Sequence, residues 1–247
     1  MNRFKSTFLA LMMLGLAPAG AWAGPGDGIA GTAHDFSGKS TSSGSTTGLC
    51  TFCHTPHKAL QTQLLWNHTL STNTFSWDAA TTTAGTTFPS FRGDTYKGPT
   101  AKCLSCHDGS VAIGDIAWFG GGRPSVVDSE RYGQGDDVNV GFGGNLAGNH
   151  PVAMPYPYLN ARNTYNNTTT GTGATLSDWR STPLDPVRVF NDDGTGNISA
   201  GPVATKTGIE CSSCHDPHNK AAVDRFFLRG SLSGSDTNYL CLKCHIK

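Results

Sequence analysis

The sequence predicts a mostly irregular fold with short helices, a few short β-hairpins and large loop content. The chain of 247 residues contains 31 Gly and 13 Pro but only 15% charged residues, a composition typical of turns and loops. Few windows repeat apolar residues at the three-to-four-residue spacing of an amphipathic helix. All eight cysteines fall in four Cys-x-x-Cys-His segments: Cys50–His54, Cys103–His107, Cys211–His215 and Cys241–His245.

These four segments predict covalent attachment of c-type haem. The two thiols of such a segment bond the vinyl groups of one haem, and the adjoining histidine is the proximal axial ligand of the iron. The sequence therefore predicts four haem c groups. They would be attached at Cys50, Cys53, Cys103, Cys106, Cys211, Cys214, Cys241 and Cys244, with proximal ligands His54, His107, His215 and His245.

Paired cysteines are also typical of structural zinc sites and of disulfide frameworks. Neither alternative explains why a histidine follows every Cys-x-x-Cys pair, and no cysteine lies outside the pairs. The pattern therefore favours haem over zinc and over disulfides.

The amino terminus predicts a signal peptide over residues 1–23. Arg3 and Lys5 precede the apolar run Phe8–Leu16, and Ala21-Trp22-Ala23 provides a small-x-small cleavage site. The apolar run is shorter than the ~20 residues that a membrane-spanning helix needs. We therefore expect an exported chain with no membrane span after cleavage, located in the periplasm, on the outer cell surface or outside the cell.

The remaining residues, 24–247, are expected to form a single tetrahaem domain. Residues 24–110 would hold the first two haems, and residues 206–247 the last two. Cleavage leaves 224 residues, or 56 per haem, so the macrocycles would supply much of the buried apolar surface. We expect the chain to pack around haem, with short helices at the Cys-x-x-Cys-His segments, and its folding to depend on haem attachment.

Between the two halves, residues 111–205 are expected to form a loop-rich and β-rich insert. Gly120–Gly122 and Gly141–Gly144 predict turns, Val138–Phe142 favours β-structure, and the Pro-rich run His150–Tyr158 predicts an extended segment. The formal net charge of the chain is +0. No basic run of the kind that binds nucleic acid or an anionic membrane surface is present.

Histidines outside the four segments are candidates for the second, distal axial ligand. An iron with both faces filled passes electrons, whereas an iron with an open face can bind and transform a substrate. Met154 is the only methionine beyond the signal peptide, so at most one haem could have a His/Met pair. Enough histidine exists for four bis-histidine haems, with candidates His34, His57, His68, His150 and His218.

Spacing restricts two of these candidates. His57 and His218 each follow a segment histidine by three residues. Trans nitrogens lie on opposite faces of the macrocycle, each ~2 Å from the metal, and three residues cannot carry the chain around the ring. Each would therefore ligate a neighbouring haem or none. Ligation would hold the rings close together, and the alternative is a surface histidine that caps a turn. His34, on a Ser/Gly-flanked arm, is either a solvated histidine or a ligand for another subunit.

Several segments resemble the doubled Cys-x-x-Cys-His family of multihaem cytochromes. They are Leu49–His57, Cys103-Leu-Ser-Cys-His-Asp-Gly, Glu210–Asn219, Phe227-Leu-Arg-Gly-Ser, His34-Asp-Phe-Ser and Leu65-Trp-Asn-His. Within that family, the haem count and size resemble the outer-surface tetrahaem cytochromes of metal-reducing bacteria that polymerise into filaments. The resemblance implies a homopolymer of stacked haems in which an iron receives a histidine from the adjacent subunit. His34 is the best candidate for that ligand.

The first functional hypothesis is electron transfer without enzymatic activity, with other multihaem cytochromes as redox partners. The protein would be a subunit of an extracellular conductive filament or a periplasmic electron shuttle. A multihaem reductase of small oxyanions or nitrogen compounds is an alternative that requires one five-coordinate haem. A further alternative is a small electron-donating subunit docked on a membrane complex.

Overall fold

The computed structural model describes most of the chain after its amino-terminal segment. Residues 1–22 lie outside the described part, and so does all of the expected signal peptide except Ala23. The described residues are 23–39, 48–57, 59, 63–76, 98–118, 131–161, 176–192, 197–224 and 226–246.

Regular structure is sparse in these residues, as the composition predicts. Two α-helices are present, α2 (Pro99–His107) and α3 (Cys211–Cys214). Loops connect them to short strands and single 3-10 turns. The strands are β1 (Met154–Pro155), β2 (Phe190–Asp192), β3 (Ile198–Ala200) and β4 (Thr207–Ile209), and the turns are η1 (Gln63–Leu65), η3 (Phe142–Gly144), η4 (Tyr158–Asn160), η5 (Leu176–Asp178) and η6 (Leu240–Lys243).

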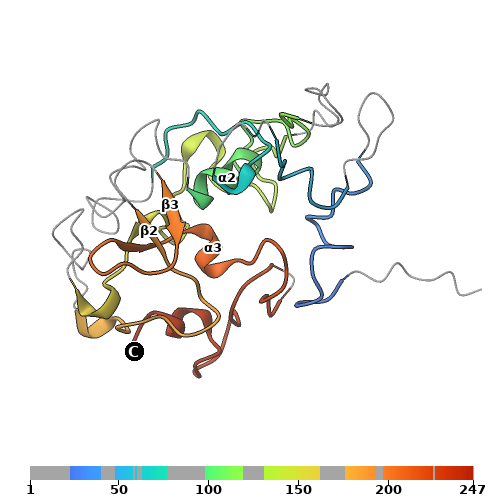
Figure 1. Ribbon diagram of the computed structural model, residues 1–247. Helices are drawn as coiled ribbons and strands as arrows, with labels where there is room; N and C mark the ends of the chain where they lie inside the picture. Colours follow the sequence, from blue (N-terminus) through green and yellow to red (C-terminus); the bar gives the residue numbers. More distant parts are fainter. Residues whose placement is uncertain are drawn as a thin grey trace, which may run out of the picture.

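The four strands form one antiparallel sheet in the order β1-β4-β2-β3. Gly208 of β4 pairs with Pro155 of β1 and with Phe190 of β2, so β4 lies inside the sheet. β4 follows the expected insert, and the sheet therefore joins the insert to the carboxyl-terminal part. It lies close to α3 in the ribbon (Figure 1).

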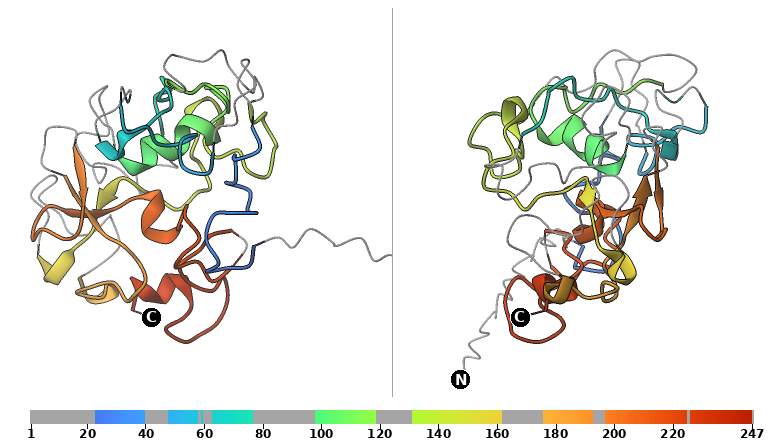
Figure 2. Two further views of the ribbon diagram at one scale, coloured as in Figure 1. Left: turned by 45° about the vertical axis from the view of Figure 1, so that its right-hand side comes forward. Right: turned by 90° about the vertical axis from the view of Figure 1, so that its left-hand side faces the viewer.

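The side-chain core is small and divided. Ala153, Phe190 and Ile198 form one buried cluster against Ala101 of α2. A second cluster contains Phe52, Ile113 and Ile116, and the Phe36 ring stacks on Phe52 at 4.2 Å between ring centres. Both views of Figure 2 place α2 above the carboxyl-terminal residues. The left view shows residues 23–39, in blue, along one side. Within the described residues, the buried apolar side chains therefore gather in two small clusters.

Short helical turns are present at three of the four Cys-x-x-Cys-His segments, as predicted. α2 contains Cys103–His107, α3 contains both cysteines of the third segment, and η6 overlaps the fourth. Pro99 begins α2 after the extended residue Gly98, a position that suits proline because its missing N–H has no helical partner. The first segment has turns instead of a helix.

One expectation for the insert is wrong. Val138–Phe142 contains no strand; the backbone turns at Gly141, where φ is 84°, into η3. The N–H of Val140 donates to the carbonyl of His107 at 2.7 Å, so pairing with a Cys-x-x-Cys-His segment replaces a β-ladder. The expected turn at Gly120–Gly122 lies outside the described residues. His150–Tyr158 includes β1 and is otherwise irregular, ending at η4.

Within the described residues, no helix has the length and apolar character needed to cross a membrane.

A substitution at Gly144 tests whether residues 74–76 pack closely against η3. Its φ is 90°, and a Cβ there would overlap the carbonyl oxygen of Thr74, whereas a Cβ on Gly143 would meet open space. Left-handed backbone alone costs an alanine about 1–2 kcal/mol. We expect Gly144→Ala to lower the free energy of unfolding by roughly 3 kcal/mol or more. Denaturant unfolding followed by circular dichroism measures the loss, and an equal loss in Gly143→Ala would contradict this packing.

Candidate functional site

We number the Cys-x-x-Cys-His segments as motif 1 (50–54), motif 2 (103–107), motif 3 (211–215) and motif 4 (241–245). In motifs 1, 3 and 4, the histidine N–H donates to the carbonyl of the first cysteine at 2.9 to 3.0 Å. This single helical turn places the first cysteine and the histidine close together. In motif 2, α2 provides the same turn.

The histidines of motifs 1, 3 and 4 each pair with a short antiparallel segment, which we call the crossing segment. The crossing segments are 64–67 for motif 1, 226–229 for motif 3 and 177–180 for motif 4. Two backbone hydrogen bonds recur in all three. The residue after the histidine donates to the crossing segment, and the crossing segment donates to the carbonyl of the second cysteine. The pairs are Thr55 to Leu65 and Asn67 to Cys53, Asp216 to Phe227 and Arg229 to Cys214, and Ile246 to Asp178 and Arg180 to Cys244.

Backbone carbonyls also fix the imidazole rings of the first three motifs. The Nδ1 atoms of His54, His107 and His215 lie 2.6, 2.7 and 2.8 Å from the carbonyl oxygens of Leu64, Val138 and Phe226 respectively. Because a carbonyl can only accept, Nδ1 carries the proton, and Nε2 keeps its lone pair for a metal. This is the second-shell arrangement that orients metal-ligating histidines. The ring geometry of these motifs therefore fits an axial haem ligand.

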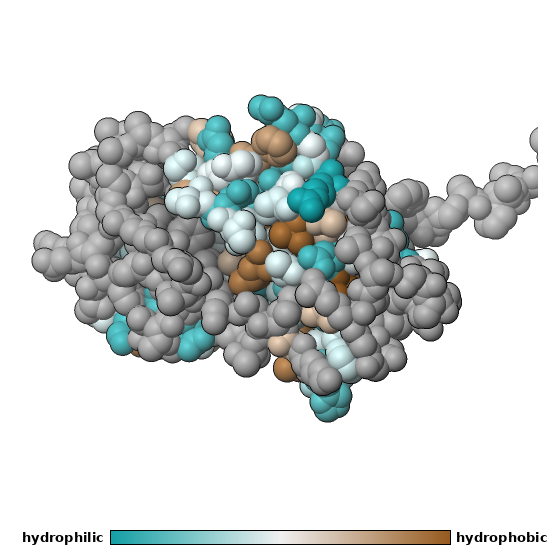
Figure 3. All heavy atoms as spheres, turned by 90° about the horizontal axis from the view of Figure 1, so that it is seen from above, coloured by the Kyte–Doolittle hydropathy of each residue, from teal (hydrophilic) through white to brown (hydrophobic). Residues whose placement is uncertain are grey.

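Apolar side chains remain exposed beside the motif histidines, where the macrocycles would cover them. On the face seen from above, apolar side chains gather among hydrophilic ones (Figure 3). Exposed apolar groups near a site are typical of surfaces that bind an apolar partner. Six exposed apolar residues lie within two positions of a motif histidine or of a carbonyl that faces an Nδ1 atom. They are Leu64, Leu65, Val138, Val140, Phe226 and Ile246.

Three motif histidines each lie opposite a non-motif histidine. The ring centres are 6.1 Å apart for His107 and His34, 6.1 Å for His54 and His218, and 6.4 Å for His245 and His150. Two axial nitrogens, each ~2 Å from one metal and about 1 Å from its own ring centre, put the ring centres about 6 Å apart. All three separations therefore fit two imidazoles on one iron.

The remaining histidines are His215 of motif 3, His57 and His68. The structure describes all nine histidines, and in it no imidazole ring faces His215 at this distance. His57 is exposed. His68 is 1% exposed, and its Nε2 has no hydrogen-bond partner among the described residues. A buried imidazole nitrogen without a partner is typical of a metal ligand.

Burial lowers the pKa of four of these histidines. Desolvation and, after it, repulsion from His107 together lower the pKa of His34 to about 4. Desolvation likewise lowers the pKa of His68 to about 4. The pKa values of His54 and His107 are also lowered, mainly by burial. Metal ligation requires the neutral form of imidazole, so these shifts suit the predicted role.

Asn219 holds the arm that carries His34. It is 2% exposed, and its Nδ2 donates to the carbonyls of Gly24 and Gly28 at 2.8 and 3.0 Å. Its Oδ1 accepts from the N–H of Gly26 at 3.2 Å. The ring of Phe227 then stacks on His34, with ring centres 4.8 Å apart and planes 6° from parallel. Residues adjoining motif 3 therefore position His34 over motif 2.

The thiols of consecutive motifs adjoin one another. Burial and, after it, the neighbouring Cys53 of motif 1 together raise the pKa of Cys106 to about 12. Interaction with the neighbouring Cys103 thiol of motif 2, together with burial, raises the pKa of Cys211. Burial and two neighbours, Cys211 and then Cys241 of motif 4, raise the pKa of Cys214 to about 11. The attachment points therefore form a series in sequence order.

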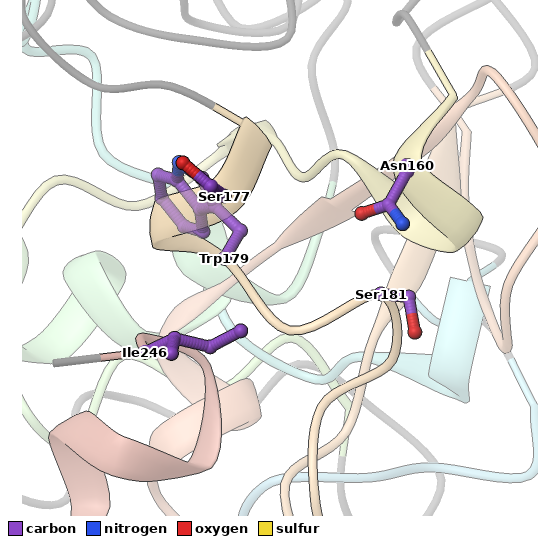
Figure 4. Close-up of a pocket in the computed structure, with 5 residues that line it drawn as sticks. All are labelled: Asn160, Ser177, Trp179, Ser181 and Ile246. Carbon is purple, nitrogen blue, oxygen red and sulfur yellow. The ribbon is translucent and has the colours of Figure 1, made fainter.

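A shallow hollow of about 440 Å³ borders motif 4. Trp179 and Ile246 line it together with Asn160, Ser177 and Ser181 (Figure 4). Trp179 also contacts motif 4, because the centre of its ring lies 4.4 Å from that of His245.

No disulfide joins any of the eight cysteines in the structure. Within the described residues, no group of three or more His, Cys, Asp and Glu side chains is arranged to hold a metal ion.

Residues 201–247, which include motifs 3 and 4, match the family described as Doubled CXXCH motif. This region carries a multihaem c-type cytochrome motif. The match indicates covalently bound c-type haem and a role in electron transfer. Among curated proteins, no sequence matches the chain.

Sequence reasoning missed the groups that orient the candidate ligands. The carbonyls of Leu64, Val138 and Phe226 carry no side-chain signal, because any residue can supply a backbone oxygen. Leu65-Trp-Asn-His and Phe227-Leu-Arg-Gly-Ser, which carry the family resemblance, lie on or overlap two crossing segments. Their position relative to motifs 1 and 3 is the signal that could have identified this role.

Asn219 provides a test of how the His34 arm is held. Asn219→Ala would leave the carbonyls of Gly24 and Gly28 without this donor, at a cost of about 1–3 kcal/mol for each buried unsatisfied group. We expect amide hydrogen exchange in residues 23–35 to accelerate roughly tenfold or more. Asn145→Ala, which removes an exposed amide with a bond only to Ala147, is the control. Unchanged exchange in Asn219→Ala would contradict the role of Asn219.

Proposed function

We propose that the chain is an electron-transfer protein that holds four haem c groups, each ligated by two histidines. The observation that carries this proposal is the set of three imidazole pairs with ring centres 6.1 to 6.4 Å apart. Each pair combines one motif histidine with one non-motif histidine, as bis-histidine ligation requires. When bound, haem supplies the one-electron redox chemistry, and the polypeptide tunes it through ligation, hydrogen bonding and burial.

The ring pairs favour specific distal ligands. His34 would serve the haem of motif 2, His218 that of motif 1 and His150 that of motif 4. His218 belongs to the peptide of motif 3, so its ligation would tie the motif-1 iron to the neighbouring attachment site, as its spacing predicts. For the motif-3 iron, His57 and His68 remain the candidates by elimination.

The adjoining thiols support an electron path in sequence order. Electrons would enter at one end haem, pass through the haems of motifs 2 and 3, and leave at the other end. Filled axial positions would leave no open iron for a substrate, which favours an electron carrier over a reductase.

The family resemblance supports a subunit of an extracellular conductive filament, with further copies of the chain and other multihaem cytochromes as partners. A periplasmic shuttle is the second candidate. The observation that favours it is the position of His34, whose ring faces His107 of its own chain. Donation of His34 to an adjacent subunit would require the arm to leave this position. Both candidates require export, which the amino-terminal sequence supports.

The haem number is tested by intact mass under denaturing conditions. We expect the mass of the exported protein to equal the polypeptide after cleavage plus four haems. We also expect no cysteine to react with iodoacetamide, because thioether formation consumes all eight thiols. Electron-microscopy images of the same sample would separate filaments from monomers. A colourless product with alkylated cysteines would contradict the proposal.

The distal assignments are tested by spin state. His34→Ala, His218→Ala and His150→Ala should each convert one haem from low spin to high spin and allow that haem to bind carbon monoxide when reduced. Asn149→Ala, which changes the exposed neighbour of His150, should leave all four haems low-spin. The His34 variant is measured in dilute monomer, so that a ligand from another subunit has no effect. Four low-spin haems in any of the three histidine variants would contradict that assignment.

A further inference from the structure

Glu210 is a carboxylate with 0% exposure that precedes motif 3. It caps α3 through a reciprocal capping box: its side chain accepts from the backbone N–H of Ser213, and its own N–H donates to the Ser213 hydroxyl at 2.9 Å. A capping box satisfies amide donors at a helix start. A serine or asparagine could cap this short helix in the same way, so capping alone does not account for a buried charge.

The same carboxylate also binds the start of α2. Its Oε2 accepts from the Thr100 N–H at 3.1 Å and from the Thr100 hydroxyl at 2.5 Å. The Thr100 hydroxyl oxygen in turn accepts from the N–H of Cys211 at 3.1 Å. Glu210 therefore joins the amino-terminal ends of the two helices that carry Cys103 and Cys211, at the point where those two thiols adjoin.

A buried cation accompanies this carboxylate. Lys102 of α2 is only 3% exposed. Burial lowers its pKa to about 8, and attraction to Glu210 opposes that lowering. Lys102 therefore brings a positive charge into the same buried region as Glu210.

We propose that Glu210 is a positioning residue for the contact between the haems of motifs 2 and 3, and that its buried charge holds the reduction potentials of these two haems down. The inference rests on the proposed function, because it requires haem at both motifs. A negative charge in a low-dielectric interior favours the oxidised iron, which carries one more positive charge than the reduced iron. Lys102 acts in the opposite direction, so the two residues set the potentials of this junction as a pair.

Glu210→Gln tests the charge while keeping the size of the side chain and an acceptor oxygen for Thr100. We expect four attached haems, with the potentials of two of them, those of motifs 2 and 3, shifted upward. The haems of motifs 1 and 4 should keep their potentials. The measurement is a redox titration of the complete haem-loaded protein, followed by NMR with haem signals assigned to each motif. Asp27→Asn, which removes an exposed carboxylate, is the matched control and should shift none of the four.

Lys102→Gln provides the complementary test and serves alone if Glu210→Gln does not fold. Removal of the positive charge should shift the same two potentials downward. Opposite shifts at the same two haems support the proposal, because a purely structural role would not reverse in sign with the charge removed. Unchanged potentials, or equal shifts at all four haems, overturn it. A protein without attached haem would instead contradict the proposed function. Failure of the proposed function is therefore distinguishable from failure of the proposed role of Glu210.

Discussion

The hydrogen bond between a motif imidazole and a backbone carbonyl is the constraint on which the site depends. Observed for His54, His107 and His215, it fixes the tautomer and directs Nε2 away from the carbonyl. His218 and His34 face two of these rings, those of His54 and His107, each with ring centres 6.1 Å apart. Crossing segments supply two of these carbonyls, so a recurring backbone arrangement organises motifs that share little sequence outside the Cys-x-x-Cys-His pattern.

The arrangement also explains how so little regular structure can hold a shape. The side-chain clusters are small, and the structure joins distant segments through buried polar groups instead. Asn67, with 0% exposure, is one example: its amide donates to the carbonyls of Thr51 and Trp118 and accepts from the Trp118 N–H. Asn219 and Glu210 act in the same way at the His34 arm and between α2 and α3. Covalent cofactors in such a frame would supply the apolar interior that the composition lacks.

The sequence alone predicts the sparse secondary structure, and its motifs indicate c-type haem because glycine content and cysteine-histidine spacing are local signals. It does not predict which histidine faces which motif, since that depends on contacts between segments as distant as His34 and Pro217. The expected β-structure at Val138–Phe142 failed for a related reason: the backbone there pairs with motif 2 instead of another strand. The sequence also does not predict the role of Glu210, because burial is not visible in a single sequence.

The central claim is tested most directly by locating the four irons. Anomalous X-ray scattering from crystals of the haem-loaded protein gives their positions. The account predicts one iron midway between the rings of His34 and His107, one between His54 and His218, and one between His150 and His245. The fourth should lie beside His215, with the haems of motifs 1 to 4 following one another in sequence order. An iron absent from any of the three midpoints, or a motif histidine paired with a different imidazole, would contradict it.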